Sequence, residues 1–381
     1  MGIEINGTVA PGFEPVRDAF AANWEHHNEV GASVAVTLAG EPVVDLWAGT
    51  ATFDSGEQEW GENTIINVWS TTKTMSFLSC LLQVERGHLD LYEPIATYWP
   101  EFAQGGKDQV ATRHVLAHTA GLSGWDEPLE TADLLDHDKL VGIHERQAPW
   151  WEPGSASGYH AISQGYLLGE IVKRTDPAGR SLGKFFADEI AGPLDADFHI
   201  GLGPDHDERV AHVIPPPDPL LAADADSDSI AVRTVTNPHL DAAYSQRKDW
   251  RRAEIPAAGG HGNARSVARI HTVTANGGEA FGQQLLSPDT IAKIFDEQAS
   301  GTDLVLQQPL RLGMGFGLKS EMMPLPNDGC CFWGGWGGSL AIIDTENKMS
   351  FSYVMNRMDQ TTTGDPRGAG VLFAAYAALM A

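Results

Sequence analysis

The pattern of apolar and polar positions near the start of the chain predicts a helix followed by a β-hairpin. From 15 to about 25, apolar residues recur at helical spacing and fall on one face. Two runs rich in valine, alanine and leucine follow at 32–38 and 42–47, and Gly40 lies between them. Two such runs joined by a short glycine turn are typical of a β-hairpin.

The rest of the chain divides into a helical middle and a second β-rich part. Between about 90 and 250 short helices alternate with long loops, and the proline and acidic residues around 215–228 predict an irregular surface segment. The remaining predicted elements are helices over 70–86, 265–276 and 369–379 and β segments over 314–318, 332–343 and 349–356.

Strands therefore gather near both termini and helices gather between them. This order predicts an α+β fold in which one antiparallel sheet, built from both termini and flanked by helices, carries an inserted helical region. We expect 1–75 and 255–381 to form the sheet domain and 76–254 the mainly helical domain. Ligand sites commonly lie between such parts, so the active site is expected at their seam.

Composition narrows the class of protein. The 381 residues are 42% hydrophobic, enough for a large core, and 51 acidic against 25 basic residues give a formal charge of −26. Such a surface repels nucleic acid and anionic lipid, so neither is expected as a partner. Three cysteines, two of them adjacent, do not suggest a disulfide framework. The start of the chain lacks a signal-peptide pattern, and we expect a cytoplasmic protein.

Ser70 and Lys73 are the first candidates for chemistry. They lie three residues apart at the start of a predicted helix, where such positions share a face. A lysine kept neutral by partial burial could take the serine proton and make the hydroxyl a nucleophile. The same spacing recurs at 181–184 and 245–248. Spacing alone therefore also allows the interpretation that Ser70 is an ordinary serine and Lys73 a solvent-exposed lysine.

Two further segments carry candidate groups. Tyr159 follows a Gly/Ser-rich loop and precedes an apolar helix, so its hydroxyl could relay a proton in a cleft; simple packing of the ring is the alternative. Gly334 and Gly335, between Trp333 and Trp336, open a predicted strand. A substrate carbonyl could approach such a backbone, although a glycine-permitted bulge explains the glycines equally well.

In this order, the segments resemble the motifs of the serine β-lactamase and penicillin-binding protein superfamily over nearly the whole chain. The Trp-Gly-Gly form of the third motif is most similar to the family VIII carboxylesterases. The residues that carry the resemblance are Ser70 and Lys73, Leu116 to Leu122, Tyr159, Gly259 to Arg269, and Trp333-Gly334-Gly335.

Two departures from the superfamily pattern bear on the substrate. Ala161 stands where the second motif has an asparagine, and Trp333 replaces the lysine or histidine of the third motif. Both losses disfavour a lactam or peptide with its carboxylate and favour a neutral ester. The resemblance then implies an apolar pocket formed by Trp333, Trp336 and Trp125, with His160 at its mouth.

The resemblance implies a carboxylesterase that cleaves esters of small acyl groups through a Ser70 acyl-enzyme. Lys73 and Tyr159 would move the protons, and the backbone N–H groups of Ser70 and Trp336 would hold the oxyanion. Acyl transfer to an alcohol is a further expected outcome. Which member of the Lys73/Tyr159 pair is the formal base stays open, because coupled groups titrate together.

Two alternatives use the same fold. One is a β-lactamase or D-amino-acid peptidase, and the other is a non-catalytic penicillin-binding-like sensor. No cofactor and no metal are expected: His114 and His118 are four residues apart but lack the glutamate and third ligand of a zinc motif. The expected partner is a small-molecule ester, and the oligomeric state is left open.

Overall fold

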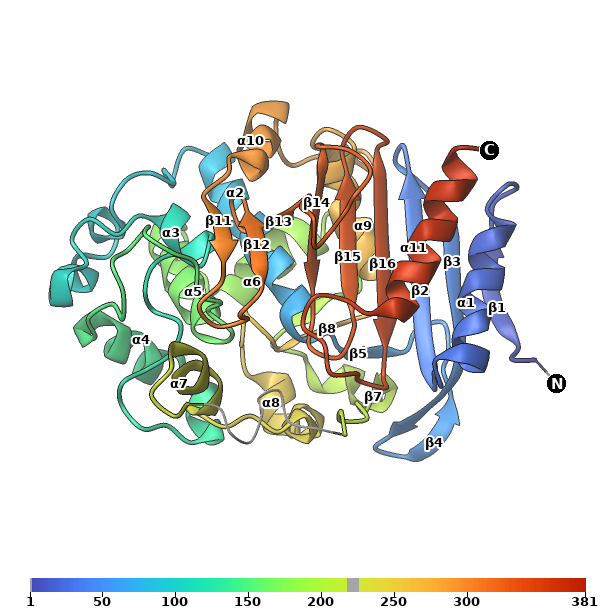
Figure 1. The fold of residues 1–381 in the computed structure, drawn as a ribbon, viewed down its shortest axis with the longest axis horizontal. Helices are drawn as coiled ribbons and strands as arrows, with labels where there is room; N and C mark the ends of the chain where they lie inside the picture. The colour runs from blue at the N-terminus through green and yellow to red at the C-terminus, as the bar shows by residue number, and fades with distance from the viewer. Residues whose placement is uncertain (1, 218–225) are drawn as a thin grey trace.

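The computed structural model describes residues 2–217 and 226–381, and its centre is a large antiparallel sheet (Figure 1). N-terminal β2 pairs with C-terminal β16, with Leu38 opposite Met349 and Ala32 opposite Met355. The prediction of one antiparallel sheet from both termini is therefore confirmed. In spatial order the strands are β1 (Ile5–Val9), β3 (Glu41–Phe53), β2 (Gly31–Leu38), β16 (Met349–Met355), β15 (Leu340–Asp344), β14 (Cys330–Gly334), β13 (Gly317–Leu318), β12 (Pro309–Leu312) and β11 (Ala299–Thr302), with β4 (Gly56–Glu59) paired to β3.

Helices cover both faces of this sheet. The terminal helices α1 (Glu14–His26) and α11 (Pro366–Leu379) pack against each other on one face, and α9 (Ala264–Ala275) contacts β2, β15 and β16 on the other (Figure 1). The buried stripe of α1 includes Val16 and Phe20, as the helical period of the sequence predicts. This arrangement gives a helix–sheet–helix sandwich.

The helical region lies beside the β11 end of the sheet (Figure 1). Its central helix α2 (Lys73–Glu85) is buried from Lys73 to Gln83 and packs against α5 (Ser163–Thr175) and α6 (Leu182–Phe186). The other elements are α3 (Thr112–Leu116), α4 (His137–Arg146), α7 (Ile230–Thr236), α8 (Lys248–Arg252), α10 (Pro288–Ala292), a small sheet of β6 (His199–Ile200), β8 (Gly260–Gly262), β5 (Ile65–Asn67) and β7 (Val210–Ala211), and the pair β9 (Glu279–Ala280) and β10 (Gln283–Gln284).

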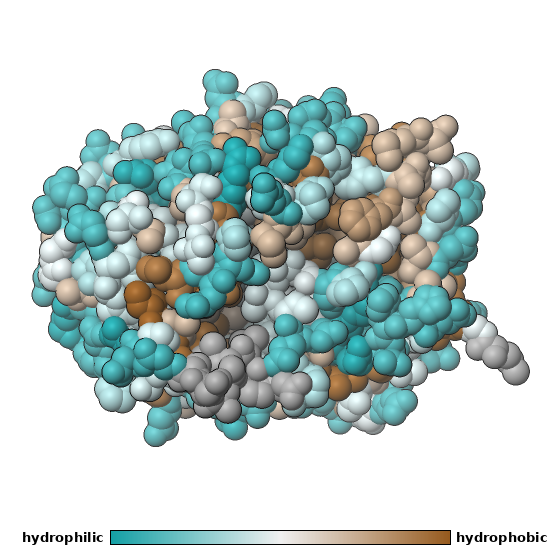
Figure 2. All heavy atoms as spheres, in the orientation of Figure 1, coloured by the Kyte–Doolittle hydropathy of each residue, from teal (hydrophilic) through white to brown (hydrophobic). Residues whose placement is uncertain are grey.

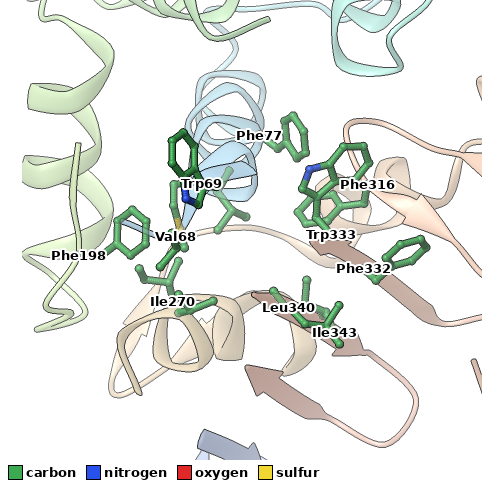
Figure 3. Close-up of a cluster of buried hydrophobic side chains, with 14 of the residues drawn as sticks. Val68, Trp69, Phe77, Phe198, Ile270, Phe316, Phe332, Trp333, Leu340 and Ile343 are labelled. Carbon is green, nitrogen blue, oxygen red and sulfur yellow. The ribbon is translucent and has the colours of Figure 1, made fainter. Parts of the chain in front are cut away.

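The seam between the helical region and the sheet is a packed apolar layer. Figure 3 shows Trp69 and Phe77 on the helical side and Phe316 and Trp333 on the sheet side. The Phe77 ring lies edge-on to Phe316 and Trp333, with centroids 5.3 and 5.8 Å away. Aromatic pairs in this geometry add to the burial energy, so α2 is fixed against the sheet.

Three predicted elements differ from the observed ones. The helix over 70–86 begins as a 3-10 turn at Trp69–Thr72, and α2 starts at Lys73. The β segment 332–343 is two strands, because the backbone turns at Gly337 and Gly338, whose φ angles of 96° and 123° favour glycine. The segment 314–318 forms a strand only at β13.

The irregular segment predicted around 215–228 lies partly outside the described residues. The division into two domains at 75 and 255 stays a prediction. Across 2–217 and 226–381, none of the helices has the length and apolar character needed to cross a membrane.

Candidate active site

Ser70 lies in the 3-10 turn that joins β5 to α2. Trp69, directly before it, has a φ angle of 50°, a left-handed conformation that costs about 1–3 kcal/mol for a residue other than glycine. The Trp69 ring packs on Trp250 and Trp336, with centroids 5.8 and 5.0 Å away. Aromatic packing therefore offsets backbone strain immediately beside the serine.

Lys73 is completely buried, one turn after Ser70. Its Nζ lies 3.1 Å from Ser70 Oγ and donates to the carbonyl oxygens of Ala161 and Ala257 at 2.6 and 2.9 Å. Burial lowers the pKa of Lys73 well below its usual value, which favours the neutral amine. A neutral amine has two N–H groups, which donate hydrogen bonds to the two carbonyl oxygens. Its one lone pair is then left to accept a hydrogen bond from the Ser70 hydroxyl.

Tyr159 approaches Ser70 from the loop before α5. Its hydroxyl donates to Ser70 Oγ at 2.6 Å, and Lys73 Nζ lies 4.9 Å from its ring centroid. Burial, and then the charge of Asp303, raise the pKa of Tyr159 above its usual range, so the phenol is protonated at rest. The three polar groups thus form a chain in which protons can pass from Tyr159 through Ser70 to Lys73.

Asp303 holds Tyr159 in place and was not identified from the sequence. Its Oδ1 accepts the backbone N–H groups of Tyr159, Val305 and Leu306 at 3.0, 2.9 and 2.9 Å. Its Oδ2 is buried and has no hydrogen-bond partner in the described structure. An aspartate that caps a turn is common, and no local pattern reveals that this one also reaches Tyr159, 144 positions away in the sequence.

Two histidines support Tyr159 from behind. The His118 ring stacks on Trp333 with centroids 5.3 Å apart and lies edge-on to Tyr159 at 5.1 Å. His160 donates its backbone N–H to His118 Nδ1 at 3.0 Å, and its own ring accepts the N–H of Leu122 at 3.1 Å. Burial lowers the pKa of His118 well below its usual value and that of His160 to about 3, so both rings are neutral.

The sequence expectations for His160 and Trp333 need correction. His160 is fully buried behind Tyr159 and does not lie at the mouth of the site. Trp333 packs between His118 and Phe77, so it forms part of the core rather than the wall of the cavity. Among the described residues its indole N–H has no partner in normal hydrogen-bond geometry, but it is close enough to the phenol to lower the pKa of Tyr159, against the larger effect of burial.

The turn after β14 packs directly on the Ser70 turn. Ser339 Oγ lies 2.8 Å from both the Val68 carbonyl oxygen and Thr71 Oγ1. A Cβ atom on Gly335 would lie 2.3 Å from that same Val68 oxygen, so only glycine allows this approach. The backbone N–H groups of Ser70 and Trp336 are not among those that hydrogen-bond within the described residues. Both N–H groups are free of other partners there, and their oxyanion role stays a prediction.

An apolar cavity opens in front of Ser70 and encloses about 680 Å³, part of it open to solvent. Trp125 and Trp336 line it, as the resemblance implied, and Trp69 joins them; Gly334 and Gly335 are not in its wall. Ser123 and Thr234 also line it, and their hydroxyl groups hydrogen-bond to each other at 2.7 Å. The remaining lining residues are Ser70, Tyr159, Ala161, Ile162, Val235, Pro238, Leu240, Ala258 and Thr362.

His114 and His118, which are spaced like a pair of metal ligands in the sequence, have other partners. His114 Nδ1 accepts the N–H of Ala111 at 3.0 Å, and His118 Nδ1 accepts that of His160. Within 2–217 and 226–381, no cluster of three or more histidine, cysteine, aspartate or glutamate side chains is arranged to hold a metal ion.

The chain is similar to known proteins over nearly its whole length. The sequence matches the Beta-lactamase family over residues 16–376. The chain is 34% identical to Esterase/beta-lactamase LipL of Mycobacterium tuberculosis over 94% of its own length and 84% of that protein. Its fold is similar to the crystal structure of a family VIII carboxylesterase (TM-score 0.92, 39% identity, 99% and 100% coverage) and to that of a penicillin-binding protein homologue from Caulobacter crescentus (TM-score 0.90, 35% identity, 98% and 100% coverage).

The chain therefore belongs to the β-lactamase family of serine hydrolases. Its relatives place it among the hydrolases of the esterase/β-lactamase type.

Proposed function

We propose that this protein is a carboxylesterase that cleaves neutral esters of small acyl groups through an acyl-enzyme on Ser70. The observation that carries the proposal is the position of Ser70 Oγ between a buried amine at 3.1 Å and a buried phenol at 2.6 Å. Neutral Lys73 can accept the serine proton, while protonated Tyr159 can give a proton to the leaving alcohol. One base and one acid thus flank one nucleophile.

In the proposed reaction Ser70 attacks the ester carbonyl as its proton moves to Lys73. The N–H groups of Ser70 and Trp336 hold the oxyanion, and Tyr159 protonates the departing alcohol oxygen. Water then attacks the acyl-enzyme, with the Lys73 and Tyr159 pair accepting its proton. An alcohol that takes the place of this water gives acyl transfer, which the apolar walls of the cavity favour over hydrolysis.

The polar groups around the site favour an ester over a lactam or peptide. The carbonyl of Ala161 is occupied by Lys73, and its methyl side chain offers no amide to a substrate. No lysine or arginine lines the cavity among the described residues, so a substrate carboxylate would find no cation. Activity on β-lactams is the second candidate because LipL is named both an esterase and a β-lactamase. Turnover of nitrocefin faster than that of an aryl ester would favour that candidate.

The proposal is tested by replacing Ser70 and following p-nitrophenyl butyrate hydrolysis. Ser70→Ala should abolish turnover and leave the thermal transition unchanged. Ser181→Ala is the matched control: this serine also precedes a lysine by three residues, but its hydroxyl caps α6 and donates to Glu254 at 2.6 Å. A phosphonate ester should add to Ser70 in intact-mass and peptide mapping. Wild-type turnover in Ser70→Ala, or an adduct on another serine, would refute the proposal.

The same experiment separates the enzyme from a non-catalytic sensor on the same fold. A sensor would bind acyl compounds without turnover. The intact chain of Tyr159, Ser70 and Lys73 favours the enzyme, because a sensor has no need of a base and an acid on either side of its serine.

A further inference from the structure

A second cavity adjoins the one at Ser70, and Tyr159 stands at the boundary between them. It encloses about 1460 Å³, including space open to solvent. Both cavities are lined by Tyr159, Ala161, Val235 and Thr362, whereas Ser70 lines only the first. Figure 2 shows a hollow on this face, near α7 and the β11–β12 hairpin, with hydrophobic side chains on one side of it and a largely hydrophilic surface farther out. The nucleophile therefore faces one cavity, and its proposed proton donor faces both.

The walls of the two cavities differ in chemistry. The first is dominated by three tryptophans and aliphatic side chains. The second carries hydroxyl and amide groups, one carboxylate (Asp226) and, among the described residues, no lysine or arginine. Its neutral polar lining residues are Ser229, Gln307, Gln308, Gln360, Thr361, Thr362 and Thr363, and its apolar ones include Ala231, Val232, Val305 and Leu306.

Several of these polar groups are available to a bound molecule. Ser229 is engaged as the N-cap of α7, and Thr361 donates to the Gly364 carbonyl at 2.7 Å. The side chains of Gln308, Thr362 and Thr363 make no hydrogen bond to another described residue. An amide and two hydroxyls offer both donors and acceptors, which is what a hydroxylated molecule needs.

The reaction geometry assigns a direction to the substrate. Tyr159 must reach the alcohol oxygen of the ester, and the acyl chain fits the apolar cavity in front of Ser70. The alcohol part then extends past Tyr159 into the second cavity. An anionic alcohol would be repelled by Asp226 and by the formal charge of −26 on the whole protein, and among the described lining residues it would find no cation to pair with. A hydrocarbon alcohol would make no hydrogen bonds to the amide and hydroxyl groups, which would stay hydrogen-bonded to water.

Resting on the proposed esterase function, we propose that this second cavity is the alcohol subsite and that it takes an uncharged polyhydroxylated alcohol of the glycerol or sugar class. The same subsite serves the leaving alcohol of the ester and an acceptor alcohol in acyl transfer. In transfer, the acceptor oxygen forms a new bond to the acyl carbon as the bond to Ser70 Oγ breaks. The acceptor's proton passes through the Lys73/Tyr159 pair to Ser70 Oγ, so the enzyme is regenerated.

The test supplies one acyl donor, p-nitrophenyl butyrate, with glycerol, 1-propanol or lactate as acceptors at equal concentration. The yield of butyryl ester relative to butyric acid is measured by gas chromatography. We expect this ratio to be at least about fivefold higher for glycerol than for 1-propanol and to saturate with glycerol concentration, and we expect lactate to give the lowest ratio. A fivefold preference corresponds to about 1 kcal/mol, the contribution of one typical hydrogen bond.

Variants locate the effect in the second cavity. Gln308→Leu and Thr363→Val should each lower the ratio for glycerol toward that for 1-propanol. Thr302→Val, on an exposed position of β11 outside either cavity, should keep the wild-type ratio. Equal ratios for glycerol and 1-propanol in the wild type, a higher ratio for lactate, or an unchanged glycerol ratio in both variants would overturn the proposal. A wild-type enzyme that does not hydrolyse p-nitrophenyl butyrate would instead count against the esterase function. Failure of the alcohol subsite and failure of the esterase function are therefore distinguishable.

Discussion

Replacing Gly335 with alanine tests whether the turn after β14 forms half of the oxyanion site. An ideal Cβ there would lie 2.3 Å from both the Val68 carbonyl oxygen and Ser339 Oγ, whereas real Cβ contacts are essentially never under 3.0 Å. The two segments must therefore separate by about 0.7 Å or more. This movement takes the Trp336 N–H away from Ser70.

The expected cost follows from the loss of one oxyanion donor. Removing such a donor typically lowers kcat by about 10² to 10³, and a displacement near 1 Å can cost about 10²-fold. We therefore expect Gly335→Ala to lower kcat for p-nitrophenyl butyrate by about two orders of magnitude, with a small change in KM. The loss should fall on kcat because the donor acts on charge that develops in the transition state.

The assay pairs steady-state kinetics with a thermal melt, so that a folding defect is detected separately. Gly370→Ala is the matched control: Gly370 lies on the exposed side of α11, and nothing stands within 4 Å of a Cβ there. Alanine inside a helix should stabilise the fold by about 0.5–1 kcal/mol without a change in kcat. A folded Gly335→Ala enzyme with kcat within threefold of the wild type would refute the proposed oxyanion geometry.

Four further predictions concern the proton chain and a buried ion cluster. Tyr159→Phe removes the 2.6 Å bond to Ser70 and should lower kcat about 10²- to 10⁴-fold with the fold intact; a change under threefold in steady-state kinetics would exclude an acid role. In a pH profile, kcat/KM should rise through the lowered pKa of Lys73, because only the neutral amine accepts a proton, and should fall at alkaline pH as Tyr159 ionises above its raised pKa. Asp303→Asn keeps an oxygen acceptor but removes the negative charge that raises the pKa of Tyr159, so the alkaline limb should move to lower pH while the acidic limb stays in place; an unmoved alkaline limb would leave Asp303 a simple turn cap. Arg367→Met leaves the carboxylates of Glu29 and Asp365 buried without their cation and should cost about 3–5 kcal/mol in denaturant unfolding, and a loss below 1 kcal/mol would contradict that reasoning.

Several functional contacts join residues that are distant in sequence. Asp303 and Tyr159 are 144 residues apart, and Ser339 reaches Val68 across 271 residues. Neither aspartate nor serine carries a local signal for such a partner, since both are common in turns. Asp303 was therefore found only in the structure, whereas Ser70, Lys73 and Tyr159 could be selected beforehand from the order of their motifs.

Burial is the second property that local patterns did not determine. His160 and Trp333 are neighbours of Tyr159 and the glycine strand in the sequence, which suggested that both line the pocket. The structure instead packs both around His118, because a stacked aromatic layer fills the space behind Tyr159. Trp125 and Trp336, by contrast, do line the cavity.

Hydrophobic periodicity, which is a local property of the chain, predicts the long helices and the main strands, and the gathering of strands near both termini predicts the antiparallel sheet. The order of the motifs along the chain then selects the candidate nucleophile. The remaining features follow from the three-dimensional arrangement. It buries Lys73 away from any carboxylate in the described residues and gives its amine two carbonyl partners, and it strains Trp69 beside Ser70. It also sets two cavities of different chemistry on either side of Tyr159. These features depend on desolvation and on contacts between distant segments, and folding alone creates both.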